Sequence, residues 1–153
     1  MFTDDVRRAI DQSVLCWLAT VDGEGQPNVS PKEMFYAVGD REIHIAEIAS
    51  PVSRRNIQGN HKVCVSFVDV FRQKGYKIHG DARMVCEDAS DFDALAAPLQ
   101  KMAGPEFKVR GVVVVEAIRA TPIVAPSYRL YPDRTEAEQI RNAFRTYGVR
   151  AVE

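Results

Sequence analysis

Residues 14–36 of the chain read VLCWLATVDGEGQPNVSPKEMFY, and this stretch decides the fold class. Its first part, as far as Val21, is almost continuously apolar, which is typical of a buried strand. An Asp-Gly pair follows and predicts a hairpin turn, because this pair tolerates positive φ. The residues from Gln26 to Tyr36 form a second predicted strand. Pro31 interrupts that strand and has no amide hydrogen for a central ladder, so it marks an edge, a bulge or a bend that faces a ligand.

The rest of the chain continues this pattern of strands with few helices between them. Apolar and β-branched runs predict further strands at residues 42–48, 62–70, 76–86 and 109–118, with a short addition at 123–130. Helical spacing predicts helices at residues 3–12, 51–59, 88–102 and 135–147, the last with a capping box formed by Thr135 and Glu138. This order favours a closed barrel or a sandwich over a doubly wound sheet.

Length and composition predict one domain, residues 1–153, that can bury a core. The formal net charge is −1, so the overall positive charge typical of nucleic-acid binding is missing. No apolar stretch reaches membrane-spanning length and the N-terminus lacks an apolar signal core, which predicts no membrane partner and a cytoplasmic location. The cysteines form no CxxC pair and the histidines are dispersed, so we expect neither disulfides nor a metal site.

Residues 49–56, ASPVSRRN, are the first candidate site. Ser50 is suited to cap a helix, and the proline after it is suited to the first helical position. The free amides of the first turn, the Ser53 hydroxyl and the guanidinium groups of Arg54 and Arg55 would then surround an anion such as a phosphate. The alternative is a capped surface helix with solvated arginines.

Two further segments carry polar groups between apolar runs. Residues 28–32, NVSPK, present a serine and a lysine beside the kink at Pro31, which suits a polar, partly anionic ligand or, alternatively, an ordinary outward face. Residues 71–76, FRQKGY, form either an exposed loop or a segment that reaches a ligand held by a partner chain. Trp17 is predicted to lie in the core, and His44 to be a structural histidine.

Taken in order, several segments resemble the pyridoxamine 5′-phosphate oxidase-like, FMN-binding split-barrel family. They are LCWLAT at 15–20, DGxGxP at 22–27, NVSPK at 28–32, IHIAE at 43–47, SPxSRRNI at 50–57, NxKVxVSF at 60–67 and GYKIxGxA at 75–82. The resemblance implies a mainly β (α+β) fold, a six-stranded antiparallel split β-barrel of Greek-key type with flanking helices. It also implies a homodimer that binds FMN in two grooves at the subunit interface.

Carried over by position, the resemblance implies a set of residues that contact the cofactor. The ring and ribityl chain would be lined by Val29, Ser30, Pro31 and Lys32, and contacted by the strand end at Ala46, Glu47 and Ser50. The phosphate would be held by Ser53 and Arg54, with Arg55 as the alternative source of charge. From the second chain the site would be approached by Gln73, Lys74 and Gly75.

The expected function is that of an FMN-dependent oxidoreductase that moves a hydride or electrons between a reduced nicotinamide and a small acceptor. No residue is identified as catalytic. The chain is not expected to make pyridoxal phosphate, because it ends in a helix instead of that oxidase's substrate-binding segment. The alternatives are a flavin-binding electron carrier or sensor without turnover, a relative that binds F420 or haem in the same barrel, and a dimeric scaffold with an empty groove.

Overall fold

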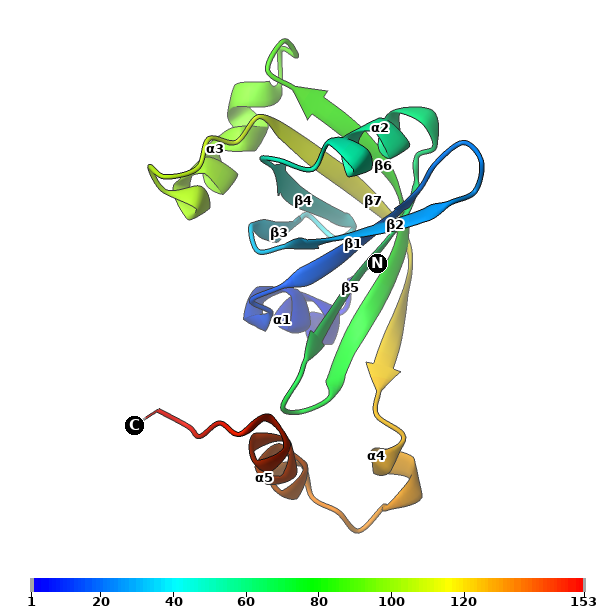
Figure 1. The fold of residues 1–153 in the computed structure, drawn as a ribbon, viewed down its shortest axis with the longest axis vertical. Helices are drawn as coiled ribbons and strands as arrows, with labels where there is room; N and C mark the ends of the chain where they lie inside the picture. Colours follow the sequence, from blue (N-terminus) through cyan, green and yellow to red (C-terminus); the bar gives the residue numbers. More distant parts are fainter. Residues whose placement is uncertain (1, 153) are drawn as a thin grey trace.

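A computed structural model describes residues 2–152 of the chain. These residues form a seven-stranded antiparallel sheet in the order β2-β1-β5-β6-β7-β4-β3 (Figure 1). The strands are β1 (Cys16–Val21), β2 (Pro27–Lys32), β3 (Phe35–Val38), β4 (Glu42–Glu47), β5 (Lys62–Asp69), β6 (Lys74–Cys86) and β7 (Gly111–Val124). The predicted mainly β architecture with flanking helices is confirmed.

The sheet has seven strands where six were expected, because the second predicted strand divides. Residues 26–36 supply both β2 and β3, which are the two edges of the sheet and are separated only by Glu33 and Met34. The Met34 carbonyl accepts a hydrogen bond from the Ala46 amide at 2.9 Å, so the chain joins β4 directly after leaving β2. The barrel is therefore split: its edges are connected through the chain and not by a ladder of hydrogen bonds.

The region after the last apolar run corrects another expectation. The predicted strands at 109–118 and 123–130 are one long strand, β7, which ends at Val124. Beyond it, residues Ser127–Leu130 form the short helix α4. Pro126 explains the change, because it has no amide hydrogen to donate to a ladder and its φ of −55° suits the start of a helix.

The longer helices begin close to their predicted positions. They are α1 (Asp4–Gln12), α2 (Pro51–Gly59), α3 (Phe92–Ala103) and α5 (Glu136–Tyr147). At the start of α1 the Thr3 hydroxyl accepts a hydrogen bond from the Val6 amide at 3.3 Å. α3 begins later than predicted because turns precede Phe92. α5 has the predicted capping box between Thr135 and Glu138.

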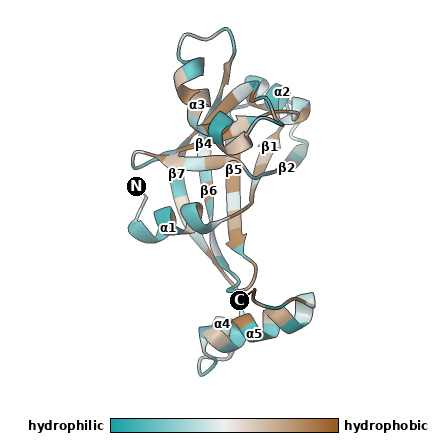
Figure 2. Ribbon diagram, turned by 90° about the vertical axis from the view of Figure 1, so that its left-hand side faces the viewer, coloured by the Kyte–Doolittle hydropathy of each residue, from teal (hydrophilic) through white to brown (hydrophobic). Residues whose placement is uncertain are grey.

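Two apolar cores hold the elements together. Inside the barrel, strand residues such as Leu18 and Ile45 are fully buried, and Ile10 of α1 packs against them. On the outside of β4 and β7, Leu99 of α3 packs in a second core that includes Val114. Each fully buried side chain of this size stabilises the fold by about 1.5–3 kcal/mol. Figure 2 shows hydrophobic segments along the strands of the barrel and a mainly hydrophilic α1.

Trp17 lies on the outer surface of the barrel and not in the core, contrary to the prediction. Its neighbours Cys16 and Leu18 are completely buried, so the alternation of side chains along β1 turns Trp17 outward, where it is 44% exposed. It pairs across the ladder with Pro31, which lies on the edge strand β2. Val29, two residues before that proline, is also exposed, so this face of β1 and β2 is partly apolar and uncovered.

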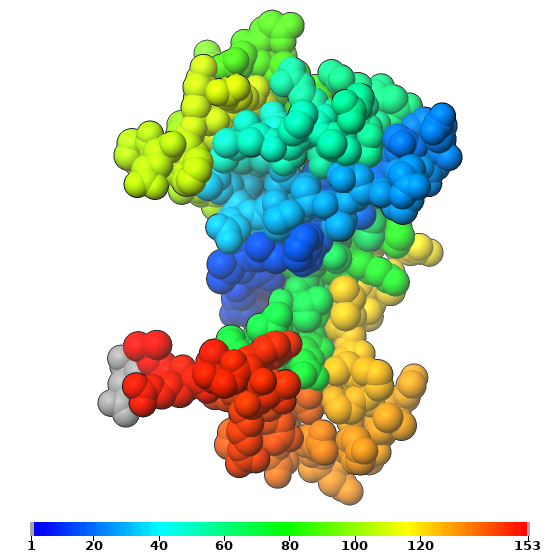
Figure 3. Space-filling view, in the orientation of Figure 1, coloured from blue at the N-terminus to red at the C-terminus, as the bar shows by residue number. Residues whose placement is uncertain are grey.

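The segment that follows β7 stands apart from the barrel. Figure 1 shows α4 and α5 below the strands, close to the turn between β5 and β6. In the space-filling view these residues form a lobe that is separated from α1 by a notch on one side (Figure 3).

Within residues 2–152, no helix is both long enough and apolar enough to cross a lipid bilayer.

Candidate functional site

The sequence-predicted serines meet beneath the first turn of α2, in a region called here the α2 corner. Ser30 on β2 and Ser53 on α2 have hydroxyl oxygens 3.0 Å apart, and Ser53 is only 2% exposed. The Asn28 side-chain amide donates to the same Ser53 hydroxyl at 3.3 Å. Asn28, Ser30 and Lys32 share one face of β2 because side chains alternate along a strand, and this face is the one that meets α2.

A buried lysine and a buried glutamate flank the same corner. Lys32 donates from Nζ to the Ser50 hydroxyl at 2.5 Å, while the Ser50 amide donates to Glu47 Oε1 at 2.7 Å. Lys32 is 8% exposed and Glu47 4%. Burial lowers the pKa of Lys32, and the Glu47 carboxylate opposes that shift. Ser50 thus connects a positive and a negative group that are both largely removed from water.

The start of α2 differs in one respect from the expected cap. Ser50 occupies the N-cap position, but its hydroxyl accepts from Lys32 and makes no capping hydrogen bond to the helix. Pro51 occupies the first turn, as predicted. Ser50 therefore leaves the amides of that turn without a side-chain acceptor, and their positive dipole end faces the corner. This arrangement favours an anion.

The two arginines of α2 lie in different surroundings. Arg54 is half-buried, and its Nη2 donates to Cys86 Sγ at 3.1 Å. Arg55 is exposed and has no ion pair among residues 2–152. The Arg54 side chain is thus held against the end of β6, whereas Arg55 extends into solvent.

A groove of about 330 Å³ opens beside the corner. It is lined by Leu15, Pro31, Lys32, Glu33, Met34, Ala46, Ile48, Ala49 and Ser50. Its size falls in the range of small-molecule sites, and its walls are mainly apolar with a few polar groups, as such sites require. The combination of a flat apolar groove, a lysine and a hydroxyl-lined helix start fits a ligand with a planar ring and an anionic tail, as FMN has. The residues present therefore fit the implied cofactor.

A second hollow adjoins this groove. It has a volume of about 440 Å³ and is lined by residues 12–15, Trp17 and residues 66–71. Leu15 lines both hollows, so they are neighbours along the start of β1. The predicted ring-contacting residue Val29 lies outside both linings and is exposed on β2.

Gln73, Lys74 and Gly75 lie away from the α2 corner of their own chain. They lie in the turn between β5 and β6 and at the start of β6, at the opposite end of the barrel from α2 (Figure 1). There Lys74 Nζ donates to Glu136 at 2.7 Å, and Gln73 accepts a hydrogen bond from Gln139. An approach from a second chain is the role predicted for them, and it stays a prediction.

Two polar residues of the corner were given no role from the sequence, although Asn56 ends the candidate segment 49–56. Asn56 on α2 donates from Nδ2 to the Thr20 hydroxyl on β1 at 3.1 Å, and the two residues are 4% and 3% exposed. The signal that could have found Asn56 is its spacing from Ser53, because residues three apart share a helix face. Thr20 stands within the apolar run of β1 and gave no such signal.

His44 is a structural histidine, as predicted. It is buried on β4, its Nε2 lies 2.9 Å from Glu42 Oε2, and the Tyr36 hydroxyl lies 3.4 Å from its Nδ1. Both ring nitrogens therefore have partners. Within the described part of the chain, no three His, Cys, Asp or Glu side chains gather closely enough to hold a metal ion.

Comparison with known proteins gives one family and several solved structures. The family model described as pyridoxamine 5′-phosphate oxidase matches residues 2–140. HupZ of Group A Streptococcus is 30% identical, with a TM-score of 0.67, and the match covers 78% of this chain and 92% of HupZ. A comparison with curated protein sequences finds no match.

Two more distant structures share the fold. An FMN-binding protein from Syntrophomonas wolfei subsp. wolfei is 17% identical with a TM-score of 0.66, over 78% of this chain and 84% of that one. HutZ, the heme storage protein of Vibrio cholerae, is 18% identical with a TM-score of 0.62, over 78% of this chain and 92% of that one.

Proposed function

The chain belongs to the pyridoxamine 5′-phosphate oxidase family, and on that basis we propose that it is a homodimeric flavoprotein that binds FMN at the α2 corner. The observation that carries the proposal is the meeting of the Ser30 and Ser53 hydroxyls, 3.0 Å apart, under a helix start that leaves its amides uncapped by Ser50. Hydroxyls and helix amides together bind phosphate well. The half-buried guanidinium of Arg54 on the same turn supports the assignment by adding positive charge.

The remaining groups of the groove orient the ring. Pro31 and Ala46 form part of the apolar wall of the groove. The buried ammonium group of Lys32 is held at the groove by its hydrogen bond to Ser50. A positive donor beside the acceptor edge of a flavin favours electron uptake by the ring. Glu47 limits that effect, because its carboxylate lies on the other side of Ser50. When bound, FMN supplies the exchange of a hydride or electrons between a reduced nicotinamide and a small acceptor.

A second copy of the chain is part of the proposal because the groove is open. Leu15 connects it to the neighbouring apolar hollow, and Trp17 and Val29 are exposed on the adjacent outer face of β1 and β2. A twofold partner that packs on this face would bury the apolar side chains and close the groove. Gel filtration at micromolar concentration should give a dimer, and a monomer would contradict this part of the proposal.

The absorbance spectrum tests the cofactor. Protein isolated or reconstituted with FMN should be yellow, and Ser53→Ala should weaken FMN binding about tenfold, the effect of one lost hydrogen bond to a charged group. Ser127→Ala is the matched control, because the Ser127 hydroxyl is buried in α4, outside the corner, and has no hydrogen-bond partner among residues 2–152.

The same titration separates the alternatives. A protein that takes up F420 or haem in place of FMN would replace the cofactor in the proposal, and one that takes up none of the three would refute it. With FMN bound, steady oxidation of a reduced nicotinamide in the presence of an electron acceptor identifies an oxidoreductase. Flavin that is bound but not turned over identifies an electron carrier or sensor.

A further inference from the structure

The turn between β5 and β6 has an unusual backbone. Among residues 2–152, Gln73 is the one non-glycine residue with a positive φ, at 56°. Its amide donates to the Asp69 carbonyl at 2.6 Å, and the Asp69 carboxylate accepts from the Arg72 amide at 2.9 Å. Such strain persists only where surrounding contacts impose it, and it often marks a functional segment. Residues 69–75 are called the hairpin tip below.

Gly75 restricts the hairpin tip further. A Cβ at this position would lie 2.0 Å from the Phe67 carbonyl oxygen and 2.8 Å from the Val68 Cα, both backbone atoms of β5. Only glycine allows the two strands to approach so closely. The tip is therefore a tightly built turn and not a loose connection.

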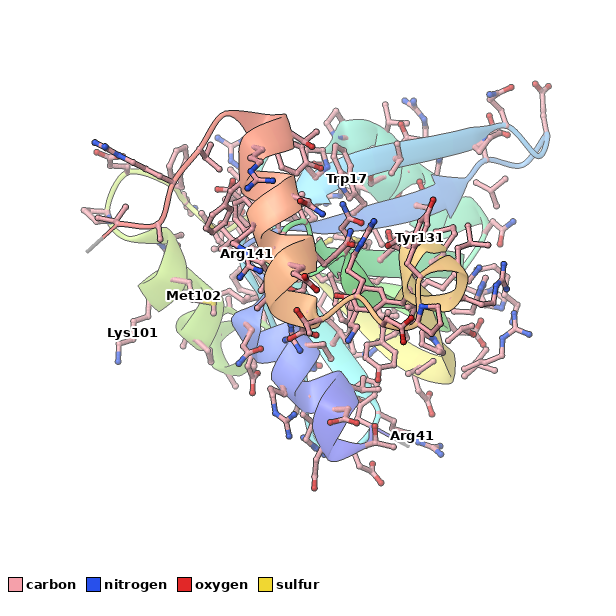
Figure 4. The ribbon with its side chains drawn as sticks, turned by 90° about the horizontal axis from the view of Figure 1, so that it is seen from below. Trp17, Arg41, Lys101, Met102, Tyr131 and Arg141 are labelled. Atoms are coloured by element: carbon pink, nitrogen blue, oxygen red, sulfur yellow. The ribbon has the colours of Figure 1, made fainter. Side chains whose placement is uncertain are left out.

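Helix α5 holds the side chains of the tip. Gln139, which is 5% exposed, donates from Nε2 to Gln73 Oε1 at 2.5 Å. Glu136 accepts from Arg72 Nε at 3.1 Å and from Lys74 Nζ at 2.7 Å. These two α5 residues and the three tip residues that they bind are called the clasp. In the view from below, α5 lies across the end of the barrel, with Arg141 and Tyr131 labelled on the same lobe (Figure 4).

Aromatic contacts reinforce the clasp. Phe71 of the tip packs edge-on against Phe144 of α5, with ring centroids 4.9 Å apart. The Tyr128 hydroxyl donates to the Arg72 carbonyl at 2.7 Å, and Lys74 Nζ lies 4.2 Å from the centre of the Tyr128 ring. The hairpin tip is thus fixed from two sides by the segment that follows β7.

The direction of one hydrogen bond decides what the tip presents. Because Gln139 donates to Gln73 Oε1, the two amide hydrogens on Gln73 Nε2 are left without an acceptor among the described residues. Lys74 is held beside it, with 38% of its side chain exposed. The tip therefore offers an oriented amide donor next to an ammonium group, which suits a ligand edge made of acceptor oxygens and nitrogens.

We infer that Glu136 and Gln139 are positioning residues, which hold Gln73 and Lys74 to donate hydrogen bonds to the acceptor edge of the flavin ring bound by the partner subunit. This role depends on the FMN site proposed above. The tip and α2 lie at opposite ends of one barrel, so the tip serves a second copy more readily than its own corner (Figure 1). The segment after β7 is then part of the cofactor site and not an appendage.

Reversing the hydrogen bond tests the role of Gln139 without removing the contact. In Gln139→Glu, a carboxylate that can only accept takes the amide hydrogens of Gln73 and turns its oxygen toward the ligand. At pH 8 we expect FMN affinity to fall about tenfold, with a shifted flavin absorbance band. Unchanged affinity and spectrum would overturn the inference, because a purely structural clasp tolerates either direction. The charge-matched control is Gln26→Glu, which adds the same negative charge at an exposed position between β1 and β2.

Mixed dimers test whether the tip acts across the interface. One protomer carries Ser53→Ala with Arg54→Ala, and the other carries Glu136→Gln with Gln139→Glu. If each site uses one corner and the partner's tip, the mixed dimer has one intact site and binds one FMN per dimer with the affinity of the unmodified protein. Two sites that are both weak would overturn the inference, because they show that each corner uses its own tip.

Hydrogen exchange tests the clasp without any flavin. Amides of residues 69–75 should exchange faster in Glu136→Gln than in the unmodified protein or in Glu138→Gln, and equal rates would overturn the positioning role. If the unmodified protein binds no FMN at all, the proposed function is wrong and flavin is not the ligand of the tip. The exchange result then still decides whether α5 positions the tip.

Discussion

The α2 corner and the clasp are built from the same kinds of side chain in opposite surroundings. In the corner, Lys32 and Glu47 are 8% and 4% exposed and are bridged by Ser50. In the clasp, the Lys74 and Glu136 side chains are 38% and 37% exposed and touch directly at 2.7 Å. Buried charges depend strongly on their partners, whereas exposed pairs are screened and weak. We therefore expect the corner to be a fixed part of the barrel and the clasp to open without unfolding it.

The largest loss of stability is expected from removing a buried charge of the α2 corner. Glu47→Ala leaves the Lys32 ammonium and the Ser50 amide without their acceptor or counter-charge, and should lower the free energy of unfolding by about 3 kcal/mol. Urea unfolding followed by circular dichroism measures this. The double variant Lys32→Met with Glu47→Leu should recover much of the loss, since an apolar pair leaves no buried charge. A loss within experimental error for Glu47→Ala would show that the corner is as weakly coupled as the clasp.

A smaller and local effect is expected from the apolar side of the clasp. Phe144→Ala removes the ring that packs on Phe71 and should destabilise the docking of α5 by about 1–2 kcal/mol. Amides of residues 136–147 should then exchange faster, while the global unfolding free energy stays nearly constant. Tyr131→Ala, a truncation of another aromatic ring after β7, is the control, because Tyr131 stacks with Arg134 and not with the hairpin tip. A large global loss would mean that the clasp is part of the barrel's cooperative unit.

Acid should open the clasp. Hydrogen bonds from Lys74 and Arg72 lower the pKa of Glu136 below its ordinary value of 4.5. A carboxyl whose pKa is lower in the folded state stabilises that state above its unfolded pKa, and the contribution is lost as pH falls through the folded value. We therefore expect the NMR signal of the Gln73 amide to shift as pH falls below about 4.5, and to shift less in Glu136→Gln. A signal that is constant to pH 3 would contradict this coupling.

Salt should give the smallest difference. Raising the ionic strength from about 0.1 M to 1 M shortens the screening length from about 10 Å to 3 Å, and should weaken the clasp by a few tenths of a kcal/mol. The corner should respond less because its charges are buried. Exchange rates at residues 69–75, compared with those of the amides of residues 50–56, measure the two responses in one experiment. Equal responses would remove the distinction between the regions.

The fold could be predicted from the sequence because local patterns and long-range pairing agree over most of the barrel. Thr3 caps α1 and Pro51 begins α2 where expected, since capping chemistry acts over three or four residues. The number of strands could not be predicted. The polarity of Glu33 and Met34 does not show whether the chain makes a kink within one strand or passes from one edge strand of the sheet to the other. Hydrogen bonding to β4 decides between the two.

Parts of the site were predictable for a similar reason. Ser30, Lys32 and Ser53 lie together because strand and helix periodicities direct them to one place. Trp17 was assigned to the core because it stands in an apolar run, yet the alternation of β1 turns it outward. The sequence singled out Gln73 but could not predict its pairing with Gln139, since the two residues are 66 positions apart and no pattern connects them.

The prolines of β2 have a consequence for how copies of this chain can associate. Pro27, Val29 and Pro31 occupy every second position of the edge strand β2, so their backbone nitrogens point to the same side of the strand. Because the two prolines have no N–H to donate to β1, this side is the one that faces away from β1. Of these three positions, Val29 alone carries an N–H, which is too little to template another strand. A further strand therefore cannot pair with this edge, and copies of the chain cannot form fibres by adding strands to β2. A second copy at this side would therefore have to pack on the broad surface of the barrel, as the proposed dimer does, and not add a strand to the sheet.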